Sequence, residues 1–311
     1  MDRRVLFNLS LPYVARAAGW IFHRKERGGS PSQRRPRRPM SSKPQRATPD
    51  ATRTSIQDRV NRRIYLSPGV DSYYHDDQLD VAEGAALLKH QPAVAGRRVL
   101  DIGVGPGRTT RFLAPLASDY LGIDYSPIMV ESFRRSFPAV AVACLDMRDL
   151  SSLAADSIDF VLASCNVIDA VSHQDRQQVL GEVRRVMCAG GIFMFSSHNR
   201  DFREAFRGPQ LRWSRSPCNQ ALHLLRFIGQ QLNHRNTGKL RQVEREYALL
   251  DDIGHDFQLL HYYIDCATQI EQLARNGFAT LEVYGHCGRV LSGSESDLDS
   301  PSLLYVATPA T

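Results

Sequence analysis

The chain has 311 residues, 42% of them hydrophobic, enough to bury the core of one large domain with an extra segment or of two small domains. Residues 1–60 hold 14 of the 39 Lys and Arg but 4 of the 33 Asp and Glu, a net charge of +10, so the other residues carry −4. The positive charge belongs to the N-terminal segment, and the mildly acidic remainder argues against a nucleic-acid-binding surface.

Residues 1–56 are predicted to form a basic tail, disordered or targeting-like, outside the fold. An apolar stretch at residues 5–22 is interrupted by Asn8, Pro12 and Arg16, so it is too broken for a membrane span, although a weak amphipathic anchor is an alternative. Residues 24–55 are rich in Arg, Pro, Ser and Thr, as is typical of disorder. The six cysteines include no C-x-x-C pair, so we expect no metal site, no disulfide framework and a cytoplasmic location.

The folded domain is placed at residues 57–311, and its first strong signal is a helix predicted over residues 80–90. Residues 99–102 then have the apolar, β-prone character of a buried parallel strand, with Asp101 near its end. Three alternating glycines follow, ahead of a helix predicted over residues 109–117: Gly103, Gly105 and Gly107. Glycines at this spacing let the backbone approach a ligand closely. A strand, a glycine turn and a helix N-terminus together predict a nucleotide-type cofactor site.

The glycine spacing excludes two common cofactor sites. A dinucleotide fingerprint, G-x-G-x-x-G, requires glycine where this chain has Arg108, and there is no G-x-x-x-x-G-K-[ST] phosphate loop. The pattern D-x-G-x-G-x-G over residues 101–107 instead resembles motif I of the class I S-adenosylmethionine-dependent methyltransferases. This resemblance implies S-adenosyl-L-methionine as cofactor, with its amino-acid part along the glycine turn and its cationic sulfonium near an acidic group. It also implies that one of three preceding tyrosines closes over the cofactor, unless they pack on the sheet edge: Tyr65, Tyr73 and Tyr74.

The second strand is predicted over residues 120–124 and ends in Asp124, 17 residues beyond the last motif glycine. An acidic side chain at this place can accept hydrogen bonds from both ribose hydroxyls. Ser126 and Pro127 then supply an N-cap and a first-turn proline for the next helix. The run YLGIDYSPIMVE, which includes Tyr125, is similar to the region after motif I in small-molecule methyltransferases.

The third strand is predicted over residues 140–145 and is followed by Asp146 and Met147. The resemblance places Asp146 near the adenine amino group and Met147 beside the adenine ring. The alternative for Asp146 is a turn or helix cap.

The fourth strand is predicted over residues 157–163, and in the resembled family it faces the transferred methyl group. Cys165 and Asn166 follow it and are further candidate cofactor residues. Enzymes of this family that methylate base or glutamine amines carry [DNS]-P-P-[YF] here, whereas this chain continues from Asn166 with Val167 and Ile168. The departure argues against those acceptors.

A helix over residues 174–187, ended by Gly190 and Gly191, leads into a fifth strand at residues 192–197. A helix is predicted at 269–276 and strands at 279–284 and 302–307. The resemblance implies that they complete the α/β, Rossmann-like, mixed seven-stranded sheet of that family, with helices on both faces. Residues 199–265 are then an insertion after strand five, containing a helix at 221–233 and a β-hairpin built from 246–250 and 255–264. In proteins of this type such an insertion covers the active site; the alternative is a structural or dimerising arm.

The predicted activity is methyl transfer to an oxygen or nitrogen atom of a small-molecule acceptor. His198 is the candidate general base, because it ends strand five, where ligands sit in open α/β sheets; His255 and His261 are the other candidates. The alternatives are a methyltransferase of RNA or of an acidic protein, with the basic tail binding that substrate, and a non-catalytic S-adenosylmethionine-binding module. A nicotinamide dehydrogenase is disfavoured by Arg108.

Overall fold

The computed structural model describes residues 55–74 and 78–310, and residues 55–311 form one compact unit. Residues 1–54, almost all of the predicted tail, lie outside the described residues. The α-helices are α2 (Ile56–Tyr65), α3 (Val81–Lys89), α4 (Thr110–Leu113), α5 (Pro127–Ser136), α6 (His173–Val186), α7 (Pro217–Thr237) and α8 (Cys266–Arg275). The strands are β1 (Arg98–Ile102), β2 (Asp119–Asp124), β3 (Val142–Cys144), β4 (Ile158–Ala163), β5 (Met187–Asn199), β6 (Gln242–Val243), β7 (Ala248–Leu250), β8 (His261–Ile264), β9 (Phe278–Tyr284) and β10 (Ser302–Pro309). The 3₁₀ helices used below are η2 (Val70–Tyr74), η4 (Val167–Ala170) and η6 (Gly254–Phe257).

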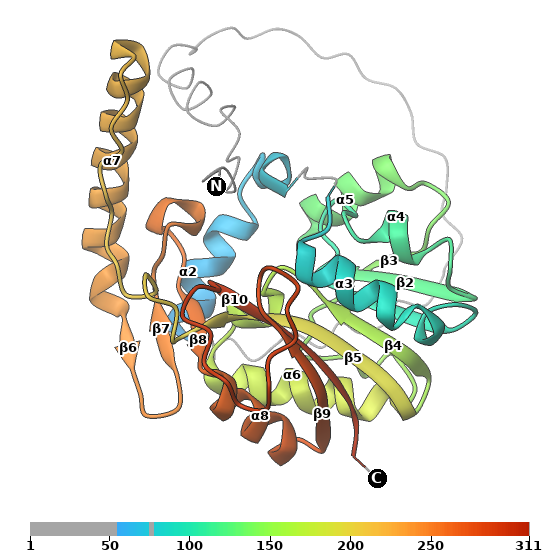
Figure 1. Cartoon of the computed structure of the whole chain (residues 1–311). Coiled ribbons are helices and arrows are strands. Elements are labelled where there is room, and N and C mark those ends of the chain that lie inside the picture. The colour runs from blue at the N-terminus through green and yellow to red at the C-terminus, as the bar shows by residue number, and fades with distance from the viewer. Residues whose placement is uncertain (1–54, 75–77, 311) are drawn as a thin grey trace, which may run out of the picture. The chain divides into compact units, whose positions relative to one another are not determined.

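The predicted seven-stranded mixed sheet is confirmed. Strands β3, β2, β1, β4 and β5 are parallel neighbours in that order, and β10 and β9 continue the sheet antiparallel beyond β5. Figure 1 shows this twisted sheet through the centre of the domain. Parallel strands place their carboxyl ends at one edge, which is where open α/β sheets bind ligands.

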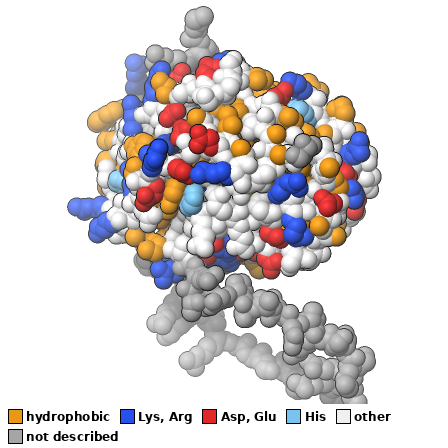
Figure 2. All heavy atoms as spheres, turned by 90° about the horizontal axis from the view of Figure 1, so that it is seen from below, with side chains coloured by type: hydrophobic (Ala, Val, Ile, Leu, Met, Phe, Trp, Pro, Cys, Tyr) orange, Lys and Arg blue, Asp and Glu red, His pale blue; other side chains and the backbone are white. Residues whose placement is uncertain are grey.

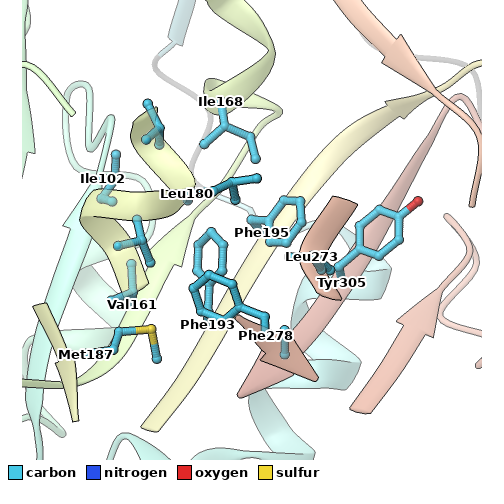
Figure 3. Packing of buried hydrophobic residues seen from close by; sticks show 14 of the residues in the cluster. Ile102, Val161, Ile168, Leu180, Met187, Phe193, Phe195, Leu273, Phe278 and Tyr305 are labelled. Carbon is cyan, nitrogen blue, oxygen red and sulfur yellow. The ribbon is translucent and has the colours of Figure 1, made fainter. Parts of the chain in front are cut away.

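Successive side chains along each strand point to opposite faces of the sheet, so the buried side chains form two core layers. Leu100 of β1 and Phe195 of β5 face a cluster with α6 and α8, whereas Val99 and Met194 face a cluster with α3, α4 and α5. Figure 3 shows the first cluster, where the rings of Phe193 and Phe195 stack with centroids 4.6 Å apart. Helices therefore cover both faces, as predicted.

The insertion adds three strands that the sequence did not place in this sheet. Strands β7 and β8 form the predicted antiparallel hairpin, β6 pairs with β7, and β8 pairs in parallel with the end of β5. The register matches His198 with Tyr263 and Asn199 with Ile264, past the last residue of β5 that pairs with β4. The sheet thus has ten strands, and the hairpin is continuous with it.

Two predicted element boundaries are wrong for identifiable reasons. The helix predicted over residues 109–117 is regular only at α4, a single turn. The helix before strand five is confirmed to within one residue as α6, but strand five begins at Met187 and not at residue 192, so Gly190 and Gly191 do not end the helix. Gly190 (φ +73°) instead lies where the β4–β5 register shifts, so the glycine pair forms an irregularity in the strand.

The surface charge is mixed, as the near balance of acidic and basic residues outside the tail predicts. Figure 2 shows acidic and basic side chains interspersed over one face. No helix in the part of the chain that the structure describes is both long and apolar enough to cross a bilayer.

Candidate active site

The predicted site residues lie at or after the carboxyl ends of the parallel strands, whose arrangement is seen in Figure 1. The glycine turn follows β1, Asp124 ends β2, Asn166 follows β4, and His198 lies near the end of β5. The turn touches the β4 loop directly, because a Cβ on Gly103 would come within 2.1 Å of Val167 Cγ2. One edge of the sheet therefore holds both the predicted cofactor residues and the predicted base.

The three motif glycines are required for different reasons. All have positive φ, +66° at Gly103, +53° at Gly105 and +103° at Gly107. A Cβ on Gly103 would meet Val167, and one on Gly107 would come within 2.4 Å of the Phe137 ring, so these two glycines permit close packing. A Cβ on Gly105 would have no atom within 4 Å. Gly105 is thus the motif glycine that borders open space, as a ligand-facing backbone requires.

Asp124 is fixed at the end of β2 by backbone donors. Its Oδ2 accepts from Gly105 N at 3.1 Å and its Oδ1 from Ser126 N at 2.8 Å. The residue is 9% exposed, and burial raises the pKa of its carboxyl to about 6. Each carboxylate oxygen still has acceptor capacity, which suits a ligand that presents hydroxyl groups.

Asp101 points into the protein. Its Oδ2 accepts from Thr109 Oγ1 at 2.5 Å and from Tyr120 OH at 2.8 Å, and the residue is 1% exposed. Burial raises the pKa of this carboxyl to about 6, against the lowering effect of the two hydroxyls. These bonds join β1, β2 and the motif loop, so a ligand contact by Asp101 stays a prediction.

The residues predicted for the adenine end lie among arginines. Asp146 is bonded by Arg148 and by Arg62 of α2, the latter at 2.5 Å. Burial would raise the pKa of Asp146, but Arg148 and then Arg62 hold it below its usual value. The Arg62 guanidinium lies 4.8 Å from the ring centroid of Tyr125. Met147 is buried in the core cluster beside α6, so adenine contacts by these residues stay predictions.

The loop after β4 is strained and carries an unused acceptor. Cys165 (φ 51°) and Asn166 (φ 55°) are consecutive non-glycine residues in the left-handed region. The buried Asn166 Oδ1 has no hydrogen-bond partner among the described residues. Arg108, which replaces the fingerprint glycine, bonds Cys165 Sγ at 3.1 Å and pairs with Glu83 of α3. An orphaned acceptor and the open space at Gly105 fit a ligand with a cationic amino group, as S-adenosyl-L-methionine has.

His198 forms an imidazole–carboxylate couple with Asp169 of η4. Asp169 Oδ2 lies 2.7 Å from His198 Nδ1 and also accepts from His198 N at 2.7 Å. Although burial would raise the pKa of Asp169, the Arg176 guanidinium and His198 lower it, so the carboxylate is anionic. An anionic acceptor at Nδ1 assigns the proton to that nitrogen and leaves the Nε2 lone pair as the basic position.

A second couple from the insertion packs against the first. His261 Nδ1 lies 2.8 Å from Asp252 Oδ2, and Tyr263 OH donates to the same oxygen at 2.7 Å. The His198 and His261 rings stack with centroids 4.8 Å apart, and His198 Nε2 is 3.9 Å from Asp252 Oδ2. Burial opposes both shifts, yet the pKa of His261 is raised by Asp252 and that of Asp252 is lowered by the histidines. His261 thus holds its proton more firmly than an ordinary histidine, which makes it the poorer base.

Ligand atoms of His198, Asp252 and His261 lie within 4.8 Å of one another, a spacing that a divalent cation could bridge. The hydrogen bonds that Asp252 accepts account for this arrangement without an ion. The expectation that the protein has no metal site stays a prediction.

His255 reaches the site from a strained loop. It and the next two residues, Asp256 and Phe257, have φ of 51°, 53° and 63°, three consecutive non-glycine residues in the left-handed region. Its Nε2 contacts Tyr74 OH, and its ring packs on Tyr65 of α2 with centroids 5.7 Å apart. Burial lowers the pKa of His255 to about 4, so it is neutral and weakly basic near pH 7.

Three site features were missed from the sequence. Gln57 and Asn61 of α2 are each 2% exposed and donate to backbone oxygens of Asp169, Ala170 and Leu260, closing α2 over the site. Their i, i+4 spacing was the available signal. The buried Arg176–Asp169 pair and the role of Asp252 had no local signal, because their partners are distant in the chain.

Comparison with known proteins gives a consistent result. Residues 99–191 match the family described as methyltransferase domain. A probable S-adenosylmethionine-dependent methyltransferase of Mycolicibacterium smegmatis is 33% identical over 106 residues, 34% of this chain and 40% of the relative. A malonyl-[acyl-carrier protein] O-methyltransferase of Legionella pneumophila is 33% identical over 181 residues, 54% of this chain and 60% of the relative. The chain therefore spans about half the length of these curated relatives.

Solved structures match over more of the chain. The 1,6-didemethyltoxoflavin-N1-methyltransferase of Burkholderia thailandensis aligns with a TM-score of 0.52 and 14% identity, covering 81% of this chain and 88% of that one. An S-adenosylmethionine-dependent methyltransferase of Clostridium acetobutylicum aligns with a TM-score of 0.51 and 12% identity, covering 74% and 92%. At these identities the likeness shows the fold alone, and the fold is the predicted one.

Proposed function

Because the chain belongs to the class I S-adenosylmethionine-dependent methyltransferases, we propose that it transfers a methyl group from S-adenosyl-L-methionine to an oxygen or nitrogen atom of a small molecule. The observation that carries the proposal is the placement of a carboxylate-oriented histidine, His198, at the same sheet edge as Asp124 and the open side of Gly105.

Bound S-adenosyl-L-methionine supplies an activated methyl group, so the protein's task is to bind, orient and exclude water. In this proposal Asp124 accepts from the ribose hydroxyls, Gly105 lets the backbone approach, and Asn166 Oδ1 accepts from the amino group. Asp101, Gly103 and Gly107 shape the loop from behind.

His198 is proposed as the catalytic base. Its Nε2 would take a proton from the acceptor's hydroxyl or amine, while Asp169 stabilises the charge that forms on the ring. Asp252 Oδ2, 3.9 Å from Nε2, offers a second negative charge to the same ring. His198 is preferred to His261, whose pKa Asp252 raises, and to His255, whose pKa burial lowers, because it lies near the end of β5 at the sheet edge that holds the cofactor residues.

Residues 199–265 are proposed as the cap of the acceptor pocket. This segment supplies Asp252, His255 and Tyr263, all near His198 or α2. A cytoplasmic location is part of the same proposal, supported by cysteines with no C-x-x-C pair. So is a domain boundary between residues 56 and 57, supported by the charge change near residue 60.

The test has two steps. Calorimetric titration with S-adenosylhomocysteine, with NADH as control, should give binding of the first compound alone. The protein is then incubated with methyl-labelled S-adenosylmethionine and a cell extract divided by ultrafiltration into small-molecule and macromolecular fractions. Label in the small-molecule fraction supports the proposal, whereas label in protein or RNA replaces it with a macromolecular acceptor. Binding without any transfer would point to a non-catalytic module.

Asp124→Ala is expected to weaken the affinity for S-adenosylhomocysteine by about 1.5–3 kcal/mol, the range for hydrogen bonds to a charged group. This corresponds to roughly 10- to 150-fold in Kd. Asp119→Ala is the matched control, because Asp119 is exposed at the opposite end of the same strand and should leave the Kd unchanged. A folded Asp124→Ala protein with wild-type affinity would remove Asp124 from the cofactor site.

The affinity for S-adenosylhomocysteine is also expected to fall as the pH drops below about 6, the pKa to which burial raises Asp124. Binding to the ionised carboxylate favours the deprotonated form, so affinity should reach a plateau above this pKa and decline up to about tenfold per pH unit below it. Asp101 has a pKa of about 6 too, so the comparison is with Asp124→Asn. If the affinity of this variant no longer depends on pH, the transition belongs to Asp124. If its affinity still falls with pH as in the wild type, another group is responsible.

A further inference from the structure

Helix α7 has one side fixed to the domain and the opposite side exposed. On the fixed side, Arg226 Nε and Gln230 Nε2 donate to Asp256 Oδ1 at 2.8 and 2.7 Å, and Asn233 Nδ2 donates to the Asp256 carbonyl at 2.9 Å. The exposed side carries an apolar stripe, with Leu225 61% exposed and Leu232 55% exposed. Figure 1 shows α7 at the margin of the molecule, its upper half standing clear of the sheet.

The stripe has the spacing of a helix-pairing seam. Four exposed apolar residues follow one another at steps of four, three and four: Ala221, Leu225, Ile228 and Leu232. This alternation is that of a coiled-coil seam, and the exposed Leu222 and Leu224 widen the apolar row over the N-terminal half of α7. The positions beside the seam carry no charge: Leu222, Leu224, Gly229 and Gln231. The geometry therefore suits another helix lying along α7.

Charge around the stripe is of one sign. Residues 205–243 contain seven Arg and Lys and no Asp or Glu. Three of the seven are paired, Arg207 with Glu204, Arg226 with Asp256 and Arg241 with Asp251. The other four are exposed and pair with no described acidic residue: Arg212 and Arg215 before the N-terminus of α7, and Arg235 and Lys239 at its C-terminus.

This distribution of charge decides which kind of partner suits the exposed side of α7. A second copy would bring cations against cations at both ends, whether the two α7 helices ran parallel or antiparallel. A bilayer-bound helix carries its cations along a solvent-facing side, whereas that side of α7 is bonded to the domain. We propose that the exposed side of α7 docks an amphipathic helix of a protein partner, with an apolar seam against the stripe and acidic side chains at its ends.

The test uses the full chain and a fluorescein-labelled synthetic peptide of the length of α7, with Leu and Ile at alternating steps of three and four and Glu at both ends. We expect saturable binding by fluorescence anisotropy that weakens about tenfold or more between low and moderate salt. Leu225→Asp with Ile228→Asp should abolish it. Arg235→Glu with Lys239→Glu, which keeps the stripe, should weaken binding and flatten its salt dependence. Leu88→Asp, at a 77% exposed leucine on α3, is the matched control and should bind as wild type.

Three results would overturn the proposal: no binding of the peptide, binding that the stripe variant retains, or wild-type binding only to phosphatidylglycerol vesicles. If light scattering shows that the wild-type protein is a dimer and the stripe variant a monomer, the exposed side of α7 is instead the contact between two copies of this chain. Each variant is also titrated with S-adenosylhomocysteine. Unchanged affinity shows that the variant is folded and keeps this result separate from the proposed methyl transfer.

Discussion

Replacing Asp169 with alanine is expected to lower the free energy of unfolding by about 3–5 kcal/mol, because it leaves the Arg176 guanidinium buried without its counter-charge. Both side chains are fully buried and form an ion pair. The guanidinium also lies 4.6 Å from the ring centroid of Tyr262. Its other hydrogen bonds go to uncharged acceptors: Ser197 Oγ at 3.1 Å, Gln269 Oε1 at 2.6 Å, Gln272 Oε1 at 3.0 Å and the Ile168 carbonyl at 3.1 Å. Hydrogen bonds to neutral acceptors do not replace a carboxylate in a water-excluded position.

Urea unfolding followed by circular dichroism measures this loss. Asp159→Ala is the control, because Asp159 pairs with Arg98 at the surface at 2.8 Å, where such a pair contributes about 0–1 kcal/mol. Equal losses in the two variants would mean that the Asp169–Arg176 pair is no stronger than a surface pair. Asp169 also orients His198, so the carboxylate proposed to stabilise the base is one on which the fold itself depends.

The second large effect is a separation of roles among the motif glycines. Gly105→Ala is expected to lower the free energy of unfolding by about 1–2 kcal/mol for its left-handed backbone. The new methyl group would enter the space proposed for the cofactor and weaken the affinity for S-adenosylhomocysteine by roughly 10- to 100-fold. Gly107→Ala should instead lower the free energy of unfolding by about 2–5 kcal/mol, because backbone strain adds to the collision with Phe137.

Thermal or urea unfolding together with calorimetry of both variants checks this separation. The Gly105→Ala protein should be folded but bind S-adenosylhomocysteine weakly. The main effect of Gly107→Ala should be a lower free energy of unfolding. If the alanine at 105 left the affinity unchanged, the open space beside Gly105 would not be the cofactor space. If the Gly107→Ala protein were as stable as the wild type, the Phe137 ring would have moved aside without lowering the free energy of unfolding.

The sequence predicted most of the sheet because buried parallel strands leave a local signature. The apolar runs of β1, β2 and β4 and their glycine or polar ends identify each strand to within a residue or two. The joining of β8 to β5 carries no such signature, since it depends on pairing between segments more than sixty residues apart. Local periodicity predicts a hairpin at β7 and β8 but does not say which sheet it extends.

The same limit applies to the site. Asp124 and Gly105 follow from spacing within one βα unit, and the structure places them against each other. The prediction for Asp146 depended on position alone and could not foresee Arg62, which reaches it from a helix more than eighty residues earlier. Asp252 was not found because its function comes from meeting His198 and His261 in space.

The length of β5 has a consequence for how ligands enter and leave. Because β8 is hydrogen-bonded to the end of β5, the strand that carries His261 and Tyr263 cannot move away from the site without breaking the pairing of the central sheet. Gln57 and Asn61 hold α2 through side-chain bonds at 2.8–3.0 Å, and no strand pairing is lost if α2 lifts. Lifting α2 would therefore open the site without loss of strand pairing, whereas moving the hairpin of β7 and β8 would break it.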